Sequence, residues 1–314
     1  MAAENAVPMA HVDGYNTSLV AMPNSTDVTP ESVLWKWNAI LARYSECDMT
    51  FMSDRLIGIA GLAKETHKAL TFCESCSADD VTYLAGLWRV HIEIQLLWRV
   101  SPRDSPKPRP KEYRAPTWSW ASVDSRFEPT WVCEDIGRQR RLIYVRAGKT
   151  SSPIDDGFVQ VFAGELEVET ALWKLARCTS TTLALKLDFI WDIDDSTIAT
   201  SNQDLYLMPA CIYLPLKTDQ GTNWNGEFVG LILQVVEGGR FERVGRAHAS
   251  LSNRHERFSD ISNFPVDDGK CTERIGTVLV EQGTVMARHI LPSEETLVGN
   301  KQNHLWERTT VVMV

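Results

Sequence analysis

Two cysteines three positions apart, Cys73 and Cys76, come nearest in this chain to a chemical motif. A C-x-x-C pair serves either as half of a structural zinc site or as a redox pair. Zinc would require a second pair or histidines at matching spacing, but the chain has no second C-x-x-C and its nearest histidines are His67 and His91. The pair also follows no βαβ pattern, which disfavours a redox role. The sequence therefore predicts a loop here, with no metal and no cofactor.

Other catalytic patterns are also missing from the sequence. No His-x-x-x-His, G-x-S-x-G, P-loop or G-x-G-x-x-G motif occurs, which argues against zinc hydrolases, serine hydrolases and nucleotide binding. A Cys–His or Ser–His pair that meets only in space stays open. The acidic residues Asp192, Asp194 and Asp195 lack the glycine and the distal glutamate of a calcium loop, so they predict a solvated turn between strands.

The residues from Tyr113 to Asp124 contain two tryptophans, Trp118 and Trp120, two positions apart. Pro116 biases the residue before it toward extended backbone, and in an extended segment both indoles share one face. We expect Arg114 to stack on an indole and Asp54 to cap its own helix. The predicted joint between helix and sheet, with a ligand pocket as the alternative, comprises Asp54, Arg55, Trp88, Trp98, Arg114, Trp118, Trp120 and Asp124.

The composition indicates a globular protein without a nucleic-acid role. The chain has 314 residues, of which 44% are hydrophobic, and a formal net charge of -9. Phosphate binding favours a basic surface, so nucleic acid is not an expected partner. No apolar run is long enough to span a bilayer. The seven scattered cysteines and the absence of a signal-peptide pattern after Met1 predict a reducing, cytoplasmic location.

Helical periodicity is confined to the first third of the chain. Thr29, Pro30 and Glu31 form a helix start, followed by apolar residues at helical spacing as far as Tyr44. A second helix is expected from Ser53 onward, with Leu56, Ile59, Ala60 and Ala63 on its apolar face and Gly58 and Gly61 as close-packing points. A third is expected after a capping box at Ser77 and Asp80, with its apolar side formed by Val81, Leu84, Ala85, Trp88, Ile92 and Leu96.

Beyond a segment with four prolines at 101–112, the pattern changes to one typical of strands. Strands are expected at 142–145, 158–169, 183–190, 205–214, 228–236, 241–244, 275–280 and 309–314, with Gly238 and Gly239 forming a hairpin turn. The predicted fold class is α+β: an N-terminal helical layer packed on a C-terminal antiparallel β region of sandwich or barrel type. The expected divisions are a poorly ordered segment 1–28, a helical region 29–100, a Pro-rich crossing 101–116 and a β region 117–314.

Four segments in order resemble the fungal heterokaryon-incompatibility (HET-domain) proteins, in the region downstream of the HET domain. Asp54–Ala63 is similar to the family's Asp-Arg-Leu-x-Ala-Ile-x-Gly-Ile-Ala segment, and Tyr83–Trp88 to its Tyr-x-Ala-Gly-Leu-Trp segment. Trp118–Ser122 resembles its Trp-Ser-Trp-Ala-Ser signature. The stretch 230–245 resembles a C-terminal hairpin that ends in Arg-Val-Gly. The segments characteristic of the HET domain itself have no counterpart here.

Because the family's cell-death signalling is attributed to the missing domain, the resemblance does not imply that activity. It implies a non-catalytic recognition or regulatory module of the non-self-recognition type, whose partner would be a separate HET-domain protein or a second copy of the chain. We expect helix faces carrying Val33, Trp37 and Tyr44, or Leu97 and Trp98, to remain exposed for that purpose. The alternative is an enzyme of fungal secondary metabolism, a cyclase or isomerase, acting on a small apolar ligand in a Trp-lined pocket.

Overall fold

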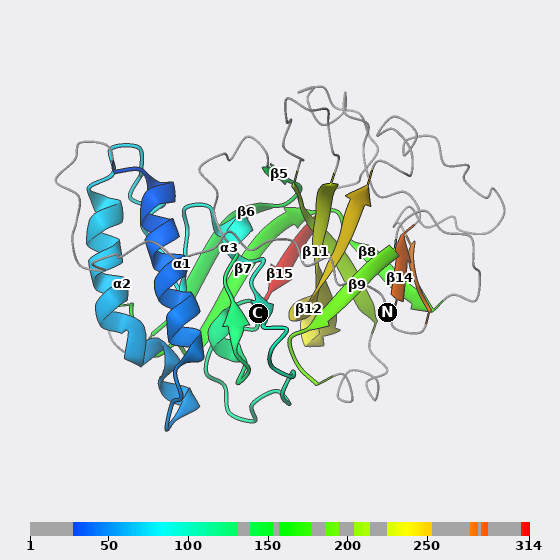
Figure 1. Ribbon diagram of the computed structural model, residues 1–314, viewed down its shortest axis with the longest axis horizontal. Coiled ribbons are helices and arrows are strands. Elements are labelled where there is room, and N and C mark those ends of the chain that lie inside the picture. Colours follow the sequence, from blue (N-terminus) through cyan, green and yellow to red (C-terminus); the bar gives the residue numbers. More distant parts are fainter. Residues whose placement is uncertain are drawn as a thin grey trace, which may run out of the picture.

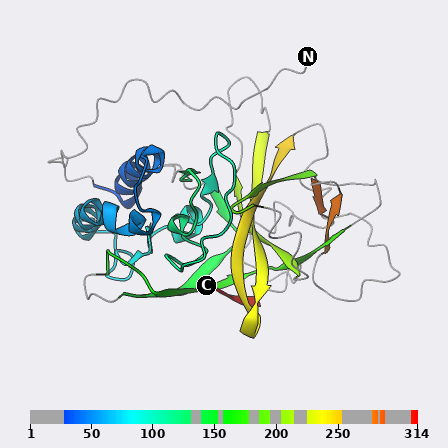
Figure 2. The same cartoon turned by 90° about the horizontal axis from the view of Figure 1, so that it is seen from below.

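The computed structural model describes residues 28–130, 139–152, 157–177, 186–194, 204–213, 225–252, 277–281, 284–287 and 309–314. The fold class is α+β, as predicted (Figure 1). Two long helices lie at one end of the molecule, and the segment from residue 77 to 128 lies between them and the main sheet (Figure 2). The expected disordered N-terminal segment lies, except for Val28, outside the described residues.

Helix α1 (Pro30–Glu46) begins as the sequence predicts. The Thr29 hydroxyl accepts a hydrogen bond from the Ser32 amide at 3.3 Å, and Pro30 occupies the first turn. Its inner face carries Leu34, Trp37 and Leu41, all nearly inaccessible to solvent. The prediction that Val33, Trp37, Leu97 and Trp98 stay exposed is therefore wrong: all four are buried, and Tyr44 is half-buried.

Helix α2 (Arg55–Thr71) follows a short 3-10 turn, η1 (Met52–Asp54). Its predicted apolar face is confirmed, since Leu56, Ile59, Ala60 and Ala63 are buried against α1 and the segment that follows. A Cβ on Gly58 would lie 2.6 Å from the Tyr44 hydroxyl of α1, so Gly58 is a close-packing point. Gly61 is not, because it is exposed and its missing Cβ would meet nothing within 4 Å.

The third predicted helix does not form. Its residues instead form a two-residue hairpin, β1 (Tyr83–Leu84) and β2 (Leu87–Trp88), and one helical turn, α3 (Ile92–Gln95). Ala85 and Gly86 form the hairpin turn with φ of 45° and 96°, values a helix excludes. The Ser77 and Asp80 side chains do bond each other's backbone amides, but they close a turn rather than a helix start.

A small second hairpin brackets the Pro-rich crossing. Strand β3 (Arg99–Val100) pairs with β4 (Phe127–Glu128), so the intervening residues leave the hairpin and return to it. Within this loop the Trp segment is not extended. Thr117 and Trp118 form a turn in which the Ser119 amide donates to the Pro116 carbonyl, and η2 (Trp120–Ser122) is a 3-10 helix.

The main sheet has eleven strands among the described residues. Their bounds are β5 (Gln139–Arg141), β6 (Tyr144–Ser151), β7 (Ala163–Thr170), β8 (Trp173–Arg177), β9 (Lys186–Trp191), β10 (Leu205–Tyr213), β11 (Asn225–Val236), β12 (Arg240–Ser252), β13 (Thr277–Glu281), β14 (Thr284–Ala287) and β15 (Thr309–Met313). Most pairs are antiparallel as expected, but β12–β15 and β13–β8 are parallel, so the sheet is mixed. β6 forms a free edge among these strands, while β11, at the other end of the strand order, also pairs with β12.

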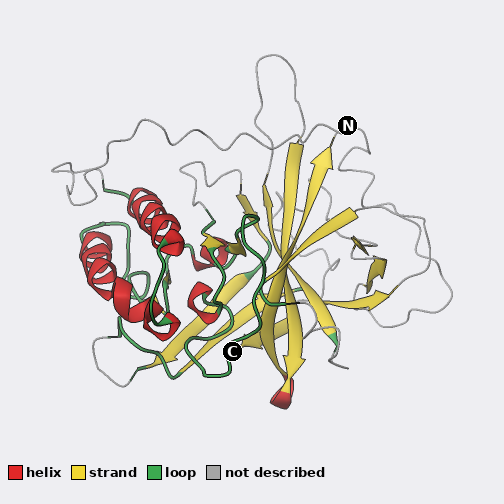
Figure 3. Ribbon diagram, turned by 60° about the horizontal axis from the view of Figure 1, so that its bottom comes forward, coloured by secondary structure: helices red, strands yellow, loops and turns green. Residues whose placement is uncertain are grey.

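The longest pairing joins β11 and β12 in the predicted hairpin, whose turn contains Gly238 and Gly239 at φ of 78° and 72°. β10 extends this hairpin on one side, and β9 and β15 pair with successive parts of β12 on the other. The C-terminal strand β15 (red in Figure 1) thus lies inside the sheet, between β12 and β7, and the C-terminus lies beside the sheet (Figure 3). The described helices include none long and apolar enough to cross a membrane.

Candidate functional site

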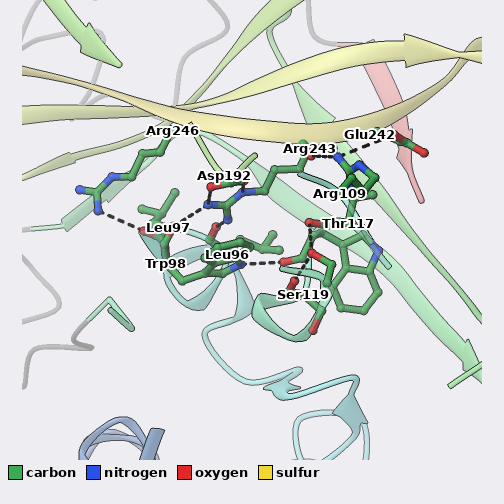
Figure 4. A network of polar contacts seen from close by, with 12 residues as sticks. Leu96, Leu97, Trp98, Arg109, Thr117, Ser119, Asp192, Glu242, Arg243 and Arg246 are labelled. Atoms are coloured by element: carbon green, nitrogen blue, oxygen red, sulfur yellow. Dashed lines mark hydrogen bonds and ion pairs between the residues drawn. The ribbon is translucent and has the colours of Figure 1, made fainter. Parts of the chain in front are cut away.

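The densest polar network in the described chain surrounds Arg243 on β12 (Figure 4). Between Arg243 and Gly245, β12 contains one residue more than β11 opposite: Ile232 pairs with Gly245 and Leu233 with Arg243, so Val244 is the extra residue of a β-bulge. A bulge shifts the alternation of side chains along a strand. Arg243 and Arg246, three positions apart, can therefore both reach the backbone of residues 96–98.

All the nitrogens of the Arg243 guanidinium are used inside the protein. Nε and Nη2 donate to the two carboxylate oxygens of Asp192 at 2.6 and 3.1 Å. Nη1 donates to the Leu96 carbonyl, and Nη2 also donates to the Trp98 carbonyl at 2.5 Å. The guanidinium carbon lies 3.7 Å from the centre of the Trp98 ring, within the range of a cation–π contact. Arg243 thus ties the segment between helices and sheet to β12.

Burial disfavours the charged forms of both Arg243 and Asp192. Arg243 is fully buried and Asp192 is 1% exposed. Burial lowers the pKa of Arg243 and raises the pKa of Asp192, while the attraction between the two opposes both shifts. A buried ion pair of this kind is costly to form and more costly to break, because removing one partner leaves an uncompensated charge.

Thr117 links the same network to the end of the chain. The Arg243 amide donates to the Thr117 hydroxyl at 3.0 Å, and that hydroxyl donates to the Val314 carbonyl. The Thr117 amide donates to the same carbonyl at 3.1 Å, and the Val314 amide donates to the Phe241 carbonyl. The turn before Trp118 is therefore fixed between β12 and the residue that follows β15.

A second buried arginine holds the other end of the Trp segment. Arg55, in the first turn of α2, donates from Nη1 to the Val123 carbonyl and from Nη2 to the Ser125 carbonyl at 3.1 Å. Its guanidinium lies 5.7 Å from the Phe127 ring centre. Burial lowers the pKa of Arg55 to about 10, so the side chain stays charged at neutral pH. Arg55 thus clamps the stretch 120–125 from a helix, whereas Arg243 holds the stretch 96–98 from the sheet.

The two tryptophans of the signature are fully buried, as predicted, but they serve different neighbours. The Trp120 ring stacks on Phe127 at 4.7 Å between centres, and its indole N–H donates to the Gly86 carbonyl at 3.0 Å. Trp118 packs toward β7, where a Cβ on Gly164 would lie 3.1 Å from its ring. The expectation that both indoles share one face is wrong because the backbone bends into a 3-10 turn between them.

The remaining candidate residues divide among three places. Trp98 belongs to the Arg243 network and donates its indole N–H to the Trp118 carbonyl at 2.9 Å. Trp88 lies in a separate aromatic cluster with Trp37, Tyr83 and Phe158.

Arg114 does not stack as predicted but forms an ion pair with Asp124 at 2.6 Å, next to the Arg55 clamp. Asp54 occupies the capping position of α2 without a side-chain capping bond, so its expected role is also wrong.

The C-x-x-C pair forms a turn at the end of α2, in which the Cys76 amide donates to the Cys73 carbonyl at 3.1 Å. Burial raises the pKa of Cys73 and raises that of Cys76 to about 11. Both groups are therefore thiols at neutral pH, which is the less reactive state for a nucleophile. The described residues contain no group of three or more side chains suited to hold a metal ion.

Sequence reasoning missed the central pair of the network. Asp192 was predicted to lie in a solvated turn, but it is buried because Arg243 reaches it from a strand 51 positions away. Arg243 lies in the hairpin segment that carries the family resemblance, but several other charged residues share its strand, so composition gave no signal that singled it out. The partner could not be read from sequence, because spacing says nothing about contacts between distant strands.

Comparison with protein-family models, with curated proteins and with solved structures finds no match to this chain.

Proposed function

We propose that this chain is a non-catalytic recognition or regulatory module, related to the fungal HET-domain proteins, that acts by associating with a second copy of itself through α2. The single observation that carries the proposal is the outer face of α2. Ile57 and Leu62 are 46% and 45% exposed on α2, and Gly61, where a Cβ would meet nothing within 4 Å, leaves the helix surface flat between them. Contiguous exposed apolar surface typically marks an interaction site.

The relation to the family is supported by the positions of the resembling segments. The first contains the start of α2 with Arg55, and the second contains the β1–β2 hairpin that meets Trp120. The third is the Trp segment, in which the Trp120 carbonyl accepts from Arg55. The fourth is the β11–β12 hairpin, in which the Arg243 amide donates to the Thr117 hydroxyl just before the Trp segment. All four segments therefore meet at one joint, which favours a common structural origin over four unrelated matches.

The enzyme alternative has less support. It requires tryptophans that line a cavity, whereas Trp88, Trp98 and Trp120 each pack against protein neighbours. Arg55 and Arg243 are also occupied, by backbone carbonyls and, for Arg243, by Asp192. Every guanidinium nitrogen of Arg243 donates within the protein, so this side chain has no free donor to offer a reacting molecule.

A second copy is the occupant that fits α2, because the exposed face is complementary to itself. Asp54, Gly61 and Lys68 are seven residues apart, so they follow one line along the helix. If two α2 helices cross antiparallel at Gly61, each Asp54 faces the Lys68 of the other copy. Two exposed phenylalanines, Phe51 and Phe72, flank the helix at similar distances from Gly61 and would meet in the same arrangement.

Lys68 is available for such a contact. Its present ion pair with Glu65, at 2.7 Å, joins side chains that are 61% and 62% exposed. Exposed pairs at this spacing contribute little, about 0.3–0.5 kcal/mol, and can exchange for an intermolecular partner. Figures 1 and 2 both place α2 at the end of the molecule away from β11 and β12, where a second copy meets no obstruction from those strands.

We expect Gly61→Lys to abolish self-association without unfolding the monomer. The new side chain would occupy the crossing point of the two helices, while its Cβ meets nothing within 4 Å in the monomer. Sedimentation velocity over a broad concentration range should show association of the wild type and a constant monomer for the variant. Ala163→Lys, which adds the same charge at an exposed position of β7, is the matched control and should behave as the wild type.

Charge reversal tests the predicted register. Asp54→Lys and Lys68→Asp should each weaken association, and the double variant should restore it because the two charges are exchanged between copies. A wild type that stays monomeric at every concentration would refute self-association. A monomer that binds a purified HET-domain chain instead would replace the second copy with a different partner and contradict the proposal in that respect.

A further inference from the structure

Beyond the Arg243 network, β12 carries a second group of charged side chains around Arg246. Arg246 is 8% exposed, and its Nη1 donates to the Leu97 carbonyl at 3.1 Å. Within the part of the chain that the structure describes, its Nη2 donates to Glu227 at a long 3.4 Å, and the Glu227 side chain is 41% exposed. Its Nε is buried and has no hydrogen-bond partner among the described residues. One edge of this guanidinium, Nε and Nη2, is therefore largely unsatisfied.

His248 lies two residues further along the strand, so its side chain points to the same face of the sheet as Arg246. Its Nδ1 is also buried without a partner among the described residues. Burial lowers the pKa of His248, so the imidazole is neutral at neutral pH and carries one N–H donor. Two buried nitrogens without partners on neighbouring side chains are unusual, because most buried polar groups are hydrogen-bonded.

The neighbours define what could bind there. Register places Val229 and Leu231 of β11 opposite His248 and Arg246, and both are fully buried apolar residues. Glu227 follows on the same face and opens to solvent. Arg99, Asp188 and Tyr213 act on the charges of this group from β3, β9 and β10. The surroundings thus combine a charged donor edge, an apolar wall and one exposed carboxylate.

We propose that Arg246 and His248 form a binding site for a small organic monocarboxylate with an apolar body. The carboxylate would accept from Nε and Nη2 of Arg246 in the two-pronged geometry that arginine favours, and Glu227 would swing into solvent. The His248 N–H would supply a further donor. A dianion such as phosphate fits less well, because Glu227 and Asp188 would repel the second charge.

This site is independent of the α2 surface, and its test does not depend on self-association. Benzoate is the probe, with benzamide as its neutral isostere and inorganic phosphate as the dianion, each titrated into the full-length protein by calorimetry. We expect benzoate to bind and the other two probes to give no saturable heat. Equal binding of benzamide, preferential binding of phosphate, or no binding of benzoate would each overturn the proposal.

Glu227→Gln provides a variant that should gain affinity. Removing the carboxylate that competes for Nη2 is expected to tighten benzoate binding about tenfold. Glu242→Gln, a control on the neighbouring strand β12, should leave it unchanged. Arg246→Lys should weaken binding about tenfold, because lysine cannot form the paired contact. If Arg246→Lys fails to fold, the Glu227→Gln result decides alone: an unchanged affinity would show that benzoate does not bind at Arg246.

Discussion

Replacing Arg243 with methionine is expected to lower the free energy of unfolding by about 3–5 kcal/mol, since it leaves the buried Asp192 carboxylate without its counter-charge. The Leu96 and Trp98 carbonyls lose their donors at the same time. Urea denaturation followed by tryptophan fluorescence measures the change. Arg240→Met removes an arginine from the same strand, but one that is half-exposed in a 3.7 Å pair with Glu165, and should shift the midpoint little.

The pH dependence of this loss separates a charge effect from a packing effect. Without Arg243, burial of Asp192 is opposed by the weaker attraction of Arg109 and Arg246, and it holds the folded-state pKa of this carboxyl above the ordinary value. A raised carboxyl pKa means that the folded form gains a proton more readily than the unfolded form. The deficit should therefore be complete at pH values above the raised pKa and shrink as pH falls through it. A deficit independent of pH would assign the loss to packing instead.

The double variant Arg243→Met, Asp192→Leu measures how much of the lost free energy of unfolding is due to the ion pair. Exchanging a buried pair for apolar residues is often neutral or stabilising. Here recovery should be incomplete, because the two carbonyls remain buried without a donor, at about 1–3 kcal/mol each. Full recovery of the free energy of unfolding would mean that the hydrogen bonds to the two carbonyls contribute nothing. Arg243 would then stabilise the fold only through its ion pair with Asp192.

The sequence predicted those parts of the fold whose signals are local. Thr29 and Pro30 specify the start of α1 through capping, and Gly238 and Gly239 specify the β11–β12 turn through positive φ. Both signals depend only on neighbouring residues. The burial of Trp118 and Trp120 was also predictable, because large apolar side chains beside a proline-rich crossing have few alternatives to the core.

The residues from 77 to 96 show where this reasoning fails. Nearly all the apolar residues there are buried, so a helical spacing and a strand spacing fit equally well and periodicity decides nothing. The hairpin depends on Ala85 and Gly86 at positive φ, and Ala-Gly is a weaker turn signal than Asn-Gly. The prediction of the candidate site failed for a similar reason. Arg55 and the tryptophans were predicted, but Asp192 and Arg243 come together only through contacts between strands that are distant in the sequence.

Trp120→Ala is expected to lower the free energy of unfolding by about 3–5 kcal/mol, the usual cost of removing a large side chain from a core. Trp120 contacts Phe127 beside the Arg55 clamp, Tyr44 of α1 and the β1–β2 turn, so its loss opens three elements together. Phe162→Ala, at a 57% exposed position, is the control and should change stability little. A wild-type urea midpoint for Trp120→Ala would refute the prediction that Trp120 joins the helices to the sheet.

The contact between Trp120 and the β1–β2 turn can also be tested by substituting Gly86 in that turn. A Cβ at this position would lie 2.5 Å from the Trp120 indole nitrogen, and φ of 96° already strains any residue other than glycine. Gly86→Ala should therefore destabilise the wild type through both clash and strain, but the Trp120→Ala background only through strain. A smaller loss in that background would locate Trp120 against the hairpin turn in solution. Equal losses in the two backgrounds would mean that the indole lies elsewhere, and the Trp segment would then not connect the helices to the sheet through this hairpin.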